Sequence, residues 1–153
     1  MSVIGKVVVA VAAAGFAAGS MIGAGTADAV VTPDGSDLFA AIAFSLDGWN
    51  YGTSVDVANP ELAINQALDN CAWDGATDCV VLAHWANGCG ALVYTDNDTS
   101  YGVGTGVGPD RESALRGAYS SLSRYYPPSI LANVGSAELS QTHVSEVVCT
   151  ADV

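Results

Sequence analysis

An internal repeat constrains the fold of this chain more than any other feature of the sequence. The two copies lie at an offset of about 50 residues, because Tyr51-Gly52 returns as Tyr101-Gly102 and the apolar run 41–45 (AIAFS) returns as 91–95 (ALVYT). With one residue of slippage, the apolar positions of the segment that follows return as well. Each copy predicts an apolar strand, a loop with glycine and aromatic residues, a helix and a second strand.

Capping residues and hydrophobic periodicity predict one helix in each copy. Asn59 is a favourable N-cap, Pro60 suits the first helical position, and the apolar residues of 63–71 fall on one face. The second helix is expected to open with Pro109-Asp110. It should end before Tyr126-Pro127-Pro128, since proline cannot continue a helix.

The strands complete the predicted architecture. They are expected over residues 38–45, 79–86, 89–95 and 143–150. Asn87-Gly88 predicts a tight hairpin between the middle two strands, because a type I′ turn needs positive φ at both central residues. The chain is therefore predicted to be α+β, a β-α-β-β-α-β pseudo-repeat. It would form a four-stranded, mainly antiparallel sheet with two helices on one face and its first and third strands in the centre.

Two further segments are predicted to be irregular. Residues 102–108 (GVGTGVG) precede the second helix, but they lack the pattern of a phosphate-binding loop. We expect a flexible connection there. Residues 129–142 have mixed polarity and are expected to form a surface excursion with a short helix around residues 130–133.

Four cysteines predict two disulfides. Cys71 ends the first predicted helix and Cys79 starts the next strand, so both lie at one end of the sheet. Cys89 starts the third strand and Cys149 ends the last, so both lie at the other end. The pairing is therefore Cys71–Cys79 and Cys89–Cys149. No CxxC pair is present, so neither a metal site nor a cofactor is expected.

The first 29 residues have the pattern of a signal peptide. Lys6 precedes an apolar run over residues 7–19, and Ala27-Asp28-Ala29 offers a cleavage site of small residues. This run is rich in alanine and weakly apolar, which favours cleavage near Ala29 over an uncleaved membrane anchor. The division is then a signal peptide at 1–29, a flexible N-terminus at 30–37 and one secreted domain at 38–150.

The net charge excludes some partners. The chain carries 4 Lys and Arg residues against 16 Asp and Glu residues, a net charge of −12. Loss of Lys6 and Asp28 with the signal leaves 3 against 15, which is again −12. Nucleic acids and anionic membranes repel such a chain, so neither is an expected partner after signal cleavage.

The motifs of residues 38–150 resemble one bacterial family. The runs AIAFS, ALDNC, DCVVLAHWANGCGALVY and YGVGTGVGPDRESAL, with a terminal cysteine, are similar to the secreted family called domain of unknown function 4189, which is common in actinobacteria. The stretches at Asn87–Ala91 and Gly104–Gly106 are the most specific. The resemblance implies export and a small α/β domain. It implies no reaction and no catalytic residues.

Catalysis and calcium binding are weakly supported. His84 and His143 are the candidate bases of a small secreted hydrolase or other enzyme, but nothing in the spacing enforces a catalytic arrangement. Asp96 begins a run of alternating oxygen ligands like a calcium loop. However, Tyr101 and Val107 occupy the positions where that loop needs Gly and Glu. The sequence thus favours a structural role for His84 within the sheet over catalysis, and a solvated loop after Asp96 over a calcium site.

Aromatic residues are candidates for a binding surface, and the alternative is that their rings cap the core at the base of the loops. Trp49 and Tyr51 in the first loop have Tyr101 as a counterpart in the second, so all three should meet at one edge of the sheet. The expected rim is acidic: Asp47, Asp56, Asp96 and Asp98.

The main hypothesis is a non-catalytic binding module of the bacterial envelope or medium, with an unknown protein or glycan partner. The alternatives are the enzyme and a secreted inhibitor or stress-related factor. A homodimer is a further hypothesis, because the first and third strands are apolar on both faces.

Overall fold

The computed structural model describes residues 37–97 and 100–151, and within them it shows two halves with the same order of elements. The first half contains β1 (Phe39–Ser45), β2 (Asn50–Val57), α1 (Pro60–Cys71) and β3 (Val80–Ala86). The second contains β4 (Cys89–Asn97), β5 (Ser100–Gly108), α2 (Arg111–Leu122), η2 (Pro127–Val134), α3 (Ala137–Ser140) and β6 (His143–Cys149). The signal peptide and most of the predicted N-terminal segment lie outside these residues.

Each half forms its own antiparallel sheet of three strands. The strand orders are β2-β1-β3 and β5-β4-β6. The prediction of an α+β chain is confirmed, but the prediction of a single four-stranded sheet is wrong. Two segments expected to be loops, β2 and β5, are strands, and each pairs with the strand before it. The first and third predicted strands, β1 and β4, are central, each in its own sheet.

The glycine-rich segment 102–108 is part of β5 because α2 packs directly on its backbone. A Cβ atom at Gly106 would lie 2.2 Å from the amide nitrogen of Ala118, and one at Gly104 would lie 2.5 Å from its carbonyl oxygen. The alternate residues Val103 and Val107 face the other sheet. The glycines therefore form a close helix–strand contact, and the prediction of a flexible connection was wrong.

Asn87-Gly88 is not a hairpin, because β3 and β4 belong to different sheets. Asn87 has the expected positive φ of 47°. Its buried side chain accepts a hydrogen bond from the N–H of Leu38 at 2.8 Å, and the carbonyl of Gly88 accepts one from the N–H of Thr150 at 2.9 Å. The turn thus carries the chain from one sheet to the other and binds both ends of the domain.

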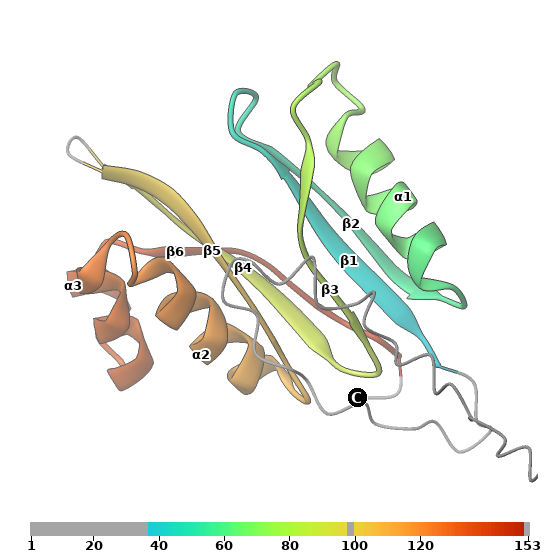
Figure 1. Ribbon diagram of the computed structural model, residues 1–153. Helices are drawn as coiled ribbons and strands as arrows, with labels where there is room; N and C mark the ends of the chain where they lie inside the picture. Colours follow the sequence, from blue (N-terminus) through green and yellow to red (C-terminus); the bar gives the residue numbers. More distant parts are fainter. Residues whose placement is uncertain (1–36, 98–99, 152–153) are drawn as a thin grey trace, which may run out of the picture.

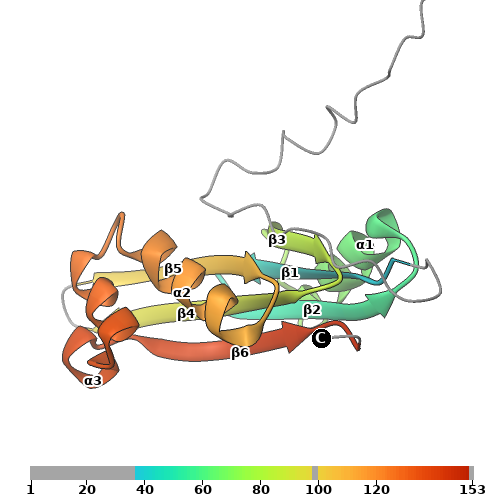
Figure 2. The ribbon, with the colours of Figure 1, turned by 90° about the horizontal axis from the view of Figure 1, so that it is seen from below.

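The elements stack in four layers, α1, sheet β2-β1-β3, sheet β5-β4-β6 and α2 (Figure 1). One core lies between α1 and its sheet, another between α2 and its sheet, and a third between the two sheets. Ile42 and Leu92 are fully buried in this third core. The apolar faces of β1 and β4 on which the homodimer hypothesis was based therefore cover each other within one chain. Figure 2 shows the strands of each sheet side by side, with α2 over the second sheet.

Both disulfides join the predicted cysteines. Cys71–Cys79 connects the end of α1 to the start of β3, and Cys89–Cys149 connects facing residues of β4 and β6. The predicted N-cap of α1, Asn59, is present, and Asp110 caps α2 in the same way. The side chain of Asn59 accepts the N–H of Glu61 at 2.8 Å, and that of Asp110 accepts the N–H of Ser113 at 2.7 Å.

The segment between α2 and β6 contains the 3-10 helix η2 where a short helix was expected. Of the helices in residues 37–97 and 100–151, none is long and apolar enough to cross a membrane.

Candidate functional site

The turn between β1 and β2 projects Trp49 toward the second sheet. Asp78 holds this turn in place, because its carboxylate accepts hydrogen bonds from the N–H of Asp47 at 2.9 Å and from the hydroxyl of Ser45. The N–H of Gly48 donates to the same Ser45 hydroxyl at 2.8 Å. The N–H of Asp47 first, and the Ser45 hydroxyl second, hold the pKa of Asp78 below its usual value. A charged carboxylate therefore anchors the turn at neutral pH.

Trp49 adopts a left-handed backbone conformation, with φ of 52°. Such a conformation costs a bulky residue about 1–2 kcal/mol, and glycine or asparagine is the usual choice. Strain of this kind persists only where the surrounding structure enforces it, and it often marks functional positions. Tryptophan therefore occupies this position although the backbone conformation there disfavours a bulky residue.

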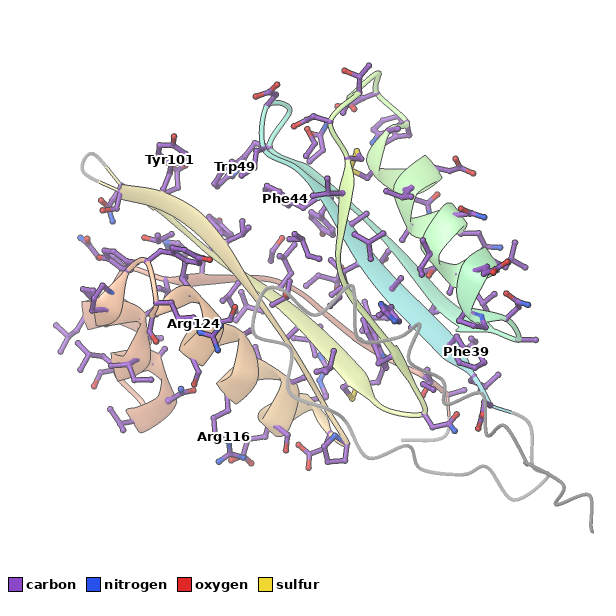
Figure 3. All side chains as sticks on the ribbon, in the orientation of Figure 1. Phe39, Phe44, Trp49, Tyr101, Arg116 and Arg124 are labelled. Atoms are coloured by element: carbon purple, nitrogen blue, oxygen red, sulfur yellow. A yellow bond between two sulfur atoms is a disulfide. The ribbon has the colours of Figure 1, made fainter. Side chains whose placement is uncertain are left out.

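The ring of Trp49 meets three other aromatic rings at steep angles. Its centroid lies 5.3 Å from Phe44, 6.5 Å from Tyr94 and 6.3 Å from Tyr101, with interplanar angles of 83°, 86° and 70°. Phe44 is buried, whereas Tyr101 is 79% exposed. Figure 3 shows Trp49 and Tyr101 facing each other between the ends of the two hairpins.

Three of these rings, those of Phe44, Trp49 and Tyr94, line a cleft between the sheets with a volume of about 310 Å³. Its lining comes from both halves: Phe44, Trp49, Tyr51, Leu92, Tyr94, Asp96, Val103 and Ser145. Figure 1 shows the two hairpins diverging at this end of the molecule. The cleft is the place where the inter-sheet core opens to solvent.

One carboxylate lines the cleft, and a second contacts the lining residue Tyr51. Asp96 belongs to the lining and stands opposite Tyr101 in the β4–β5 ladder. Glu146 on β6 accepts a hydrogen bond from the hydroxyl of Tyr51 at 3.4 Å, which joins the two sheets across the cleft. The imidazole of His143 lies 5.3 Å from the ring of Tyr94.

The cations of residues 37–97 and 100–151 lie elsewhere. They are Arg111, Arg116 and Arg124, all on α2 or just after it. Arg116 forms an ion pair with Glu112 at 3.5 Å. Figure 3 shows Arg116 and Arg124 beside α2, away from Trp49. The cleft thus combines aromatic walls with unopposed carboxylates.

Of the three residues predicted from sequence, Trp49 and Tyr51 line this cleft, and Tyr101 contacts the ring of Trp49. The predicted rim is only partly there. Asp96 lines the cleft, but Asp56 lies at the opposite end of β2, where its carboxylate accepts the N–H of Ala151 at 2.7 Å. Asp98 lies outside the described residues. Ligand binding by this surface stays a prediction.

Sequence reasoning did not include Phe44 and Tyr94 in the site. Both carried a signal, because they are equivalent positions of the repeat, as are Tyr51 and Tyr101. The cleft is therefore lined by the repeated pair Phe44 and Tyr94 together with Tyr51 and Trp49, and Tyr101 contacts the ring of Trp49.

The two histidines do not come together. His84 on β3 stands opposite Ala41, which is buried beneath α1. His143 on β6 stands opposite Tyr94, on the cleft side of the other sheet. In the part of the chain that the structure describes, no group of three or more metal-ligating side chains is found.

Comparison with known proteins identifies a family. A family model described as domain of unknown function (DUF4189) matches residues 39–128, as the motifs indicated. No curated protein and no solved structure matches the chain.

Proposed function

The chain belongs to the DUF4189 family, and we propose that it is a secreted binding module whose site is the aromatic cleft between the two sheets. The observation that carries this proposal is the strained, half-buried Trp49 set among Phe44, Tyr94 and Tyr101. Aromatic side chains offer a large contact area at little entropic cost, and they dominate the energetics of binding surfaces.

Binding is favoured over catalysis by what the cleft contains. A hydrolase using both histidines needs a base, a nucleophile and an orienting group within hydrogen-bond reach. His84 and His143 lie on different sheets, and His84 faces α1 rather than the cleft. The cleft instead has apolar walls with a few polar groups, the usual character of a ligand pocket.

Nuclear magnetic resonance of the indole N–H signals tests this proposal directly. The described chain has three tryptophans, of which Trp73 is 82% exposed and Trp85 only 4% exposed. A panel of small saccharides, short peptides and small amines is titrated into the oxidised protein. At least one class should shift the signal of Trp49 and leave that of Trp73 in place.

Matched variants locate the site. Tyr101→Ala should weaken the response about tenfold, because an exposed ring at a binding surface commonly contributes 1–2 kcal/mol. Tyr125 is 72% exposed and is not among the residues around the cleft, so Tyr125→Ala is the control. A panel that leaves the Trp49 signal unmoved, or that moves the Trp73 signal equally, contradicts the proposal.

Export is the second part of the proposal. The two disulfides support it, since such bonds form and persist in oxidising compartments. Intact mass spectrometry of the native protein should give a chain that begins at Val30 and has no free thiol. A native protein that retains Met1 and four reduced cysteines would contradict export.

A further inference from the structure

Resting on the proposed binding function, we propose that the cleft receives an organic ammonium group, either a quaternary ammonium or the primary ammonium of a lysine side chain. The juxtaposition that carries this inference is a set of steeply angled aromatic rings beside Asp96 and Glu146. Three features of the cleft support it: the arrangement of the rings, the distribution of charge, and the size.

The rings meet at steep angles, as the walls of an aromatic cage do. Trp49 meets Phe44, Tyr94 and Tyr101 at 83°, 86° and 70°, so the rings stand as walls and are not stacked in parallel. The π face of each ring carries partial negative charge and attracts a cation within about 6 Å, most strongly at tryptophan. Neutral apolar ligands gain no such attraction.

The charge distribution favours a cation at the same place. Asp96 lines the cleft beside Tyr101, and the carboxylate of Glu146 is held at the cleft by the hydroxyl of Tyr51. The arginines lie on or after α2, beyond the second sheet, and the whole chain has a net charge of −12. A cationic group is therefore attracted both from a distance and at contact.

The size limits what can enter. A volume of about 310 Å³ lies at the lower end of the range of about 300–1,000 Å³ that is usual for ligand pockets. Buried Phe44 and Leu92 close its inner end. A head group or a single side chain fits this space, with the remainder of the ligand left in solvent.

The probes are choline, a lysine residue blocked at both ends, and the carbon isostere of choline, in which a tert-butyl group replaces trimethylammonium. Each is titrated into the oxidised protein while the indole signals of Trp49 and Trp73 are followed. We expect choline or the lysine derivative to shift Trp49 with an affinity about tenfold above that of the isostere. The relative response of the two ammonium probes identifies the source.

Charge-matched variants test the role of Asp96. Asp96→Asn should weaken ammonium binding about threefold and reduce its salt dependence, because one carboxylate near the cation is neutralised. Asp69 is exposed on α1, on the far side of the first sheet, and Asp69→Asn makes the same change in net charge. It should leave the affinity unchanged.

The ring itself is tested with Trp49→Gly, since glycine adopts the positive φ of this turn without strain. Because this variant lacks the Trp49 signal, its binding of each probe is measured by titration calorimetry and compared with that of the unchanged protein. Loss of the ring should abolish the preference for ammonium over the isostere, with Trp73→Ala as control. The signals of Trp85 and a test for free thiols show that the variant has folded.

Three results would overturn the inference: equal binding of choline and its isostere, no shift of Trp49 by either ammonium probe, or equal weakening by Asp96→Asn and Asp69→Asn. Neutral saccharides or peptides that still shift Trp49 would leave the binding function in place and reject ammonium alone. The two failures are thus distinguishable.

Discussion

The two halves of the molecule build the same sheet but place its third strand by different means. In the first half, a short connection of residues 72–79 leads from α1 to β3, and Cys71–Cys79 clips it at the helix end. In the second half, residues 123–142 separate α2 from β6, and Cys89–Cys149 joins β6 directly to β4. The comparison shows that one architecture tolerates a long excursion where a disulfide fixes the strand that follows.

The halves also differ in how closely the helix approaches its sheet. In the first half, Gly52 on β2 is the point of close approach, where a Cβ atom would lie 2.1 Å from the amide nitrogen of Cys71. In the second half, Gly104, Gly106 and Gly108 on β5 repeat this contact along the length of α2. The first sheet depends on one such position, and the second on a row of them.

Removal of each disulfide should cause the largest losses of unfolding free energy, and the loss should differ between the two halves. In the chain-entropy model, the Cys89–Cys149 bond contributes about 4.3 kcal/mol and the Cys71–Cys79 bond about 2.6 kcal/mol, because the first closes a far longer loop. Denaturant unfolding of the two double Cys→Ser variants measures both losses. Equal losses, or a larger loss at Cys71–Cys79, would show that β6 is held mainly by its neighbours.

A methyl group on β5 should have the next largest effect. Gly106→Ala forces a Cβ atom against the backbone of α2 and should cost about 3 kcal/mol, because backbone atoms cannot move aside as side chains do. At Gly102 the nearest atom is a methyl carbon of Leu122 at 3.5 Å, so Gly102→Ala should change the stability by less than about 1 kcal/mol. Thermal unfolding measures both variants. A similar loss in the two would mean that α2 is not seated as described.

The glycines of β5 explain why part of the fold escaped prediction from sequence. Glycine is uncommon in strands, so the run GVGTGVG indicated a loop. Its alternation was nevertheless a strand signal, with one face for the helix and Val103 and Val107 for the other sheet. β2 was missed because its sequence, NYGTSVDV, has few apolar residues. The glycine face of β5 can be assigned to the helix only when the position of α2 is known.

The elements that were predicted have local causes. Asn59 and Asp110 cap their helices through their own side chains, and the cysteine positions followed from where α1, β3, β4 and β6 begin or end. The hairpin predicted at Asn87-Gly88 was wrong, although Asn87 does have the positive φ that its sequence favours. The hydrogen-bond partners of this turn, Leu38 and Thr150, are far away in the sequence, so they could not be inferred from the local pattern. For the site, the repeat located Tyr51 and Tyr101, but the angles between the rings depend on how the sheets stack.

The turn at Asn87 joins the two halves. Removing the Asn87 side chain should reduce the unfolding free energy by less than the Gly106→Ala clash between β5 and α2. Asn87→Gly keeps the positive φ and removes the side chain that accepts from Leu38 and donates to Asp37 at 2.8 Å each. We expect a loss of about 2 kcal/mol, the usual penalty for a buried polar partner left unsatisfied. Asn133→Ala, which removes only longer contacts of 3.3 Å, should change the stability by less than about 0.5 kcal/mol. Equal values in chemical denaturation would show that this turn does not couple the sheets.

Lowering the pH should weaken the cap at Asp110 and leave the cap at Asn59 unchanged. Of the predicted changes in stability, this one should be the smallest. The N–H of Ser113 first, then its hydroxyl, lower the pKa of Asp110, whereas the cap at Asn59 does not titrate. The Asp110 cap therefore contributes its full stabilisation above the ordinary pKa of an aspartate, and loses it as the pH falls through the lowered value. The N–H signal of Ser113 should move over that window, while that of Glu61 stays in place.

The same comparison predicts how stability responds to exchanged caps. Asp110→Asn should reduce the loss of unfolding free energy between neutral and acidic pH, and Asn59→Asp should increase it by giving the first half a titrating cap. The pH dependence of the unfolding free energy that remains in Asp110→Asn should decrease further when Asp78→Asn is added. The reason is that hydrogen bonds from the N–H of Asp47 and the hydroxyl of Ser45 also lower the pKa of Asp78. An acid response unchanged in Asp110→Asn would place the acid sensitivity of this chain in its turns and not in its helices.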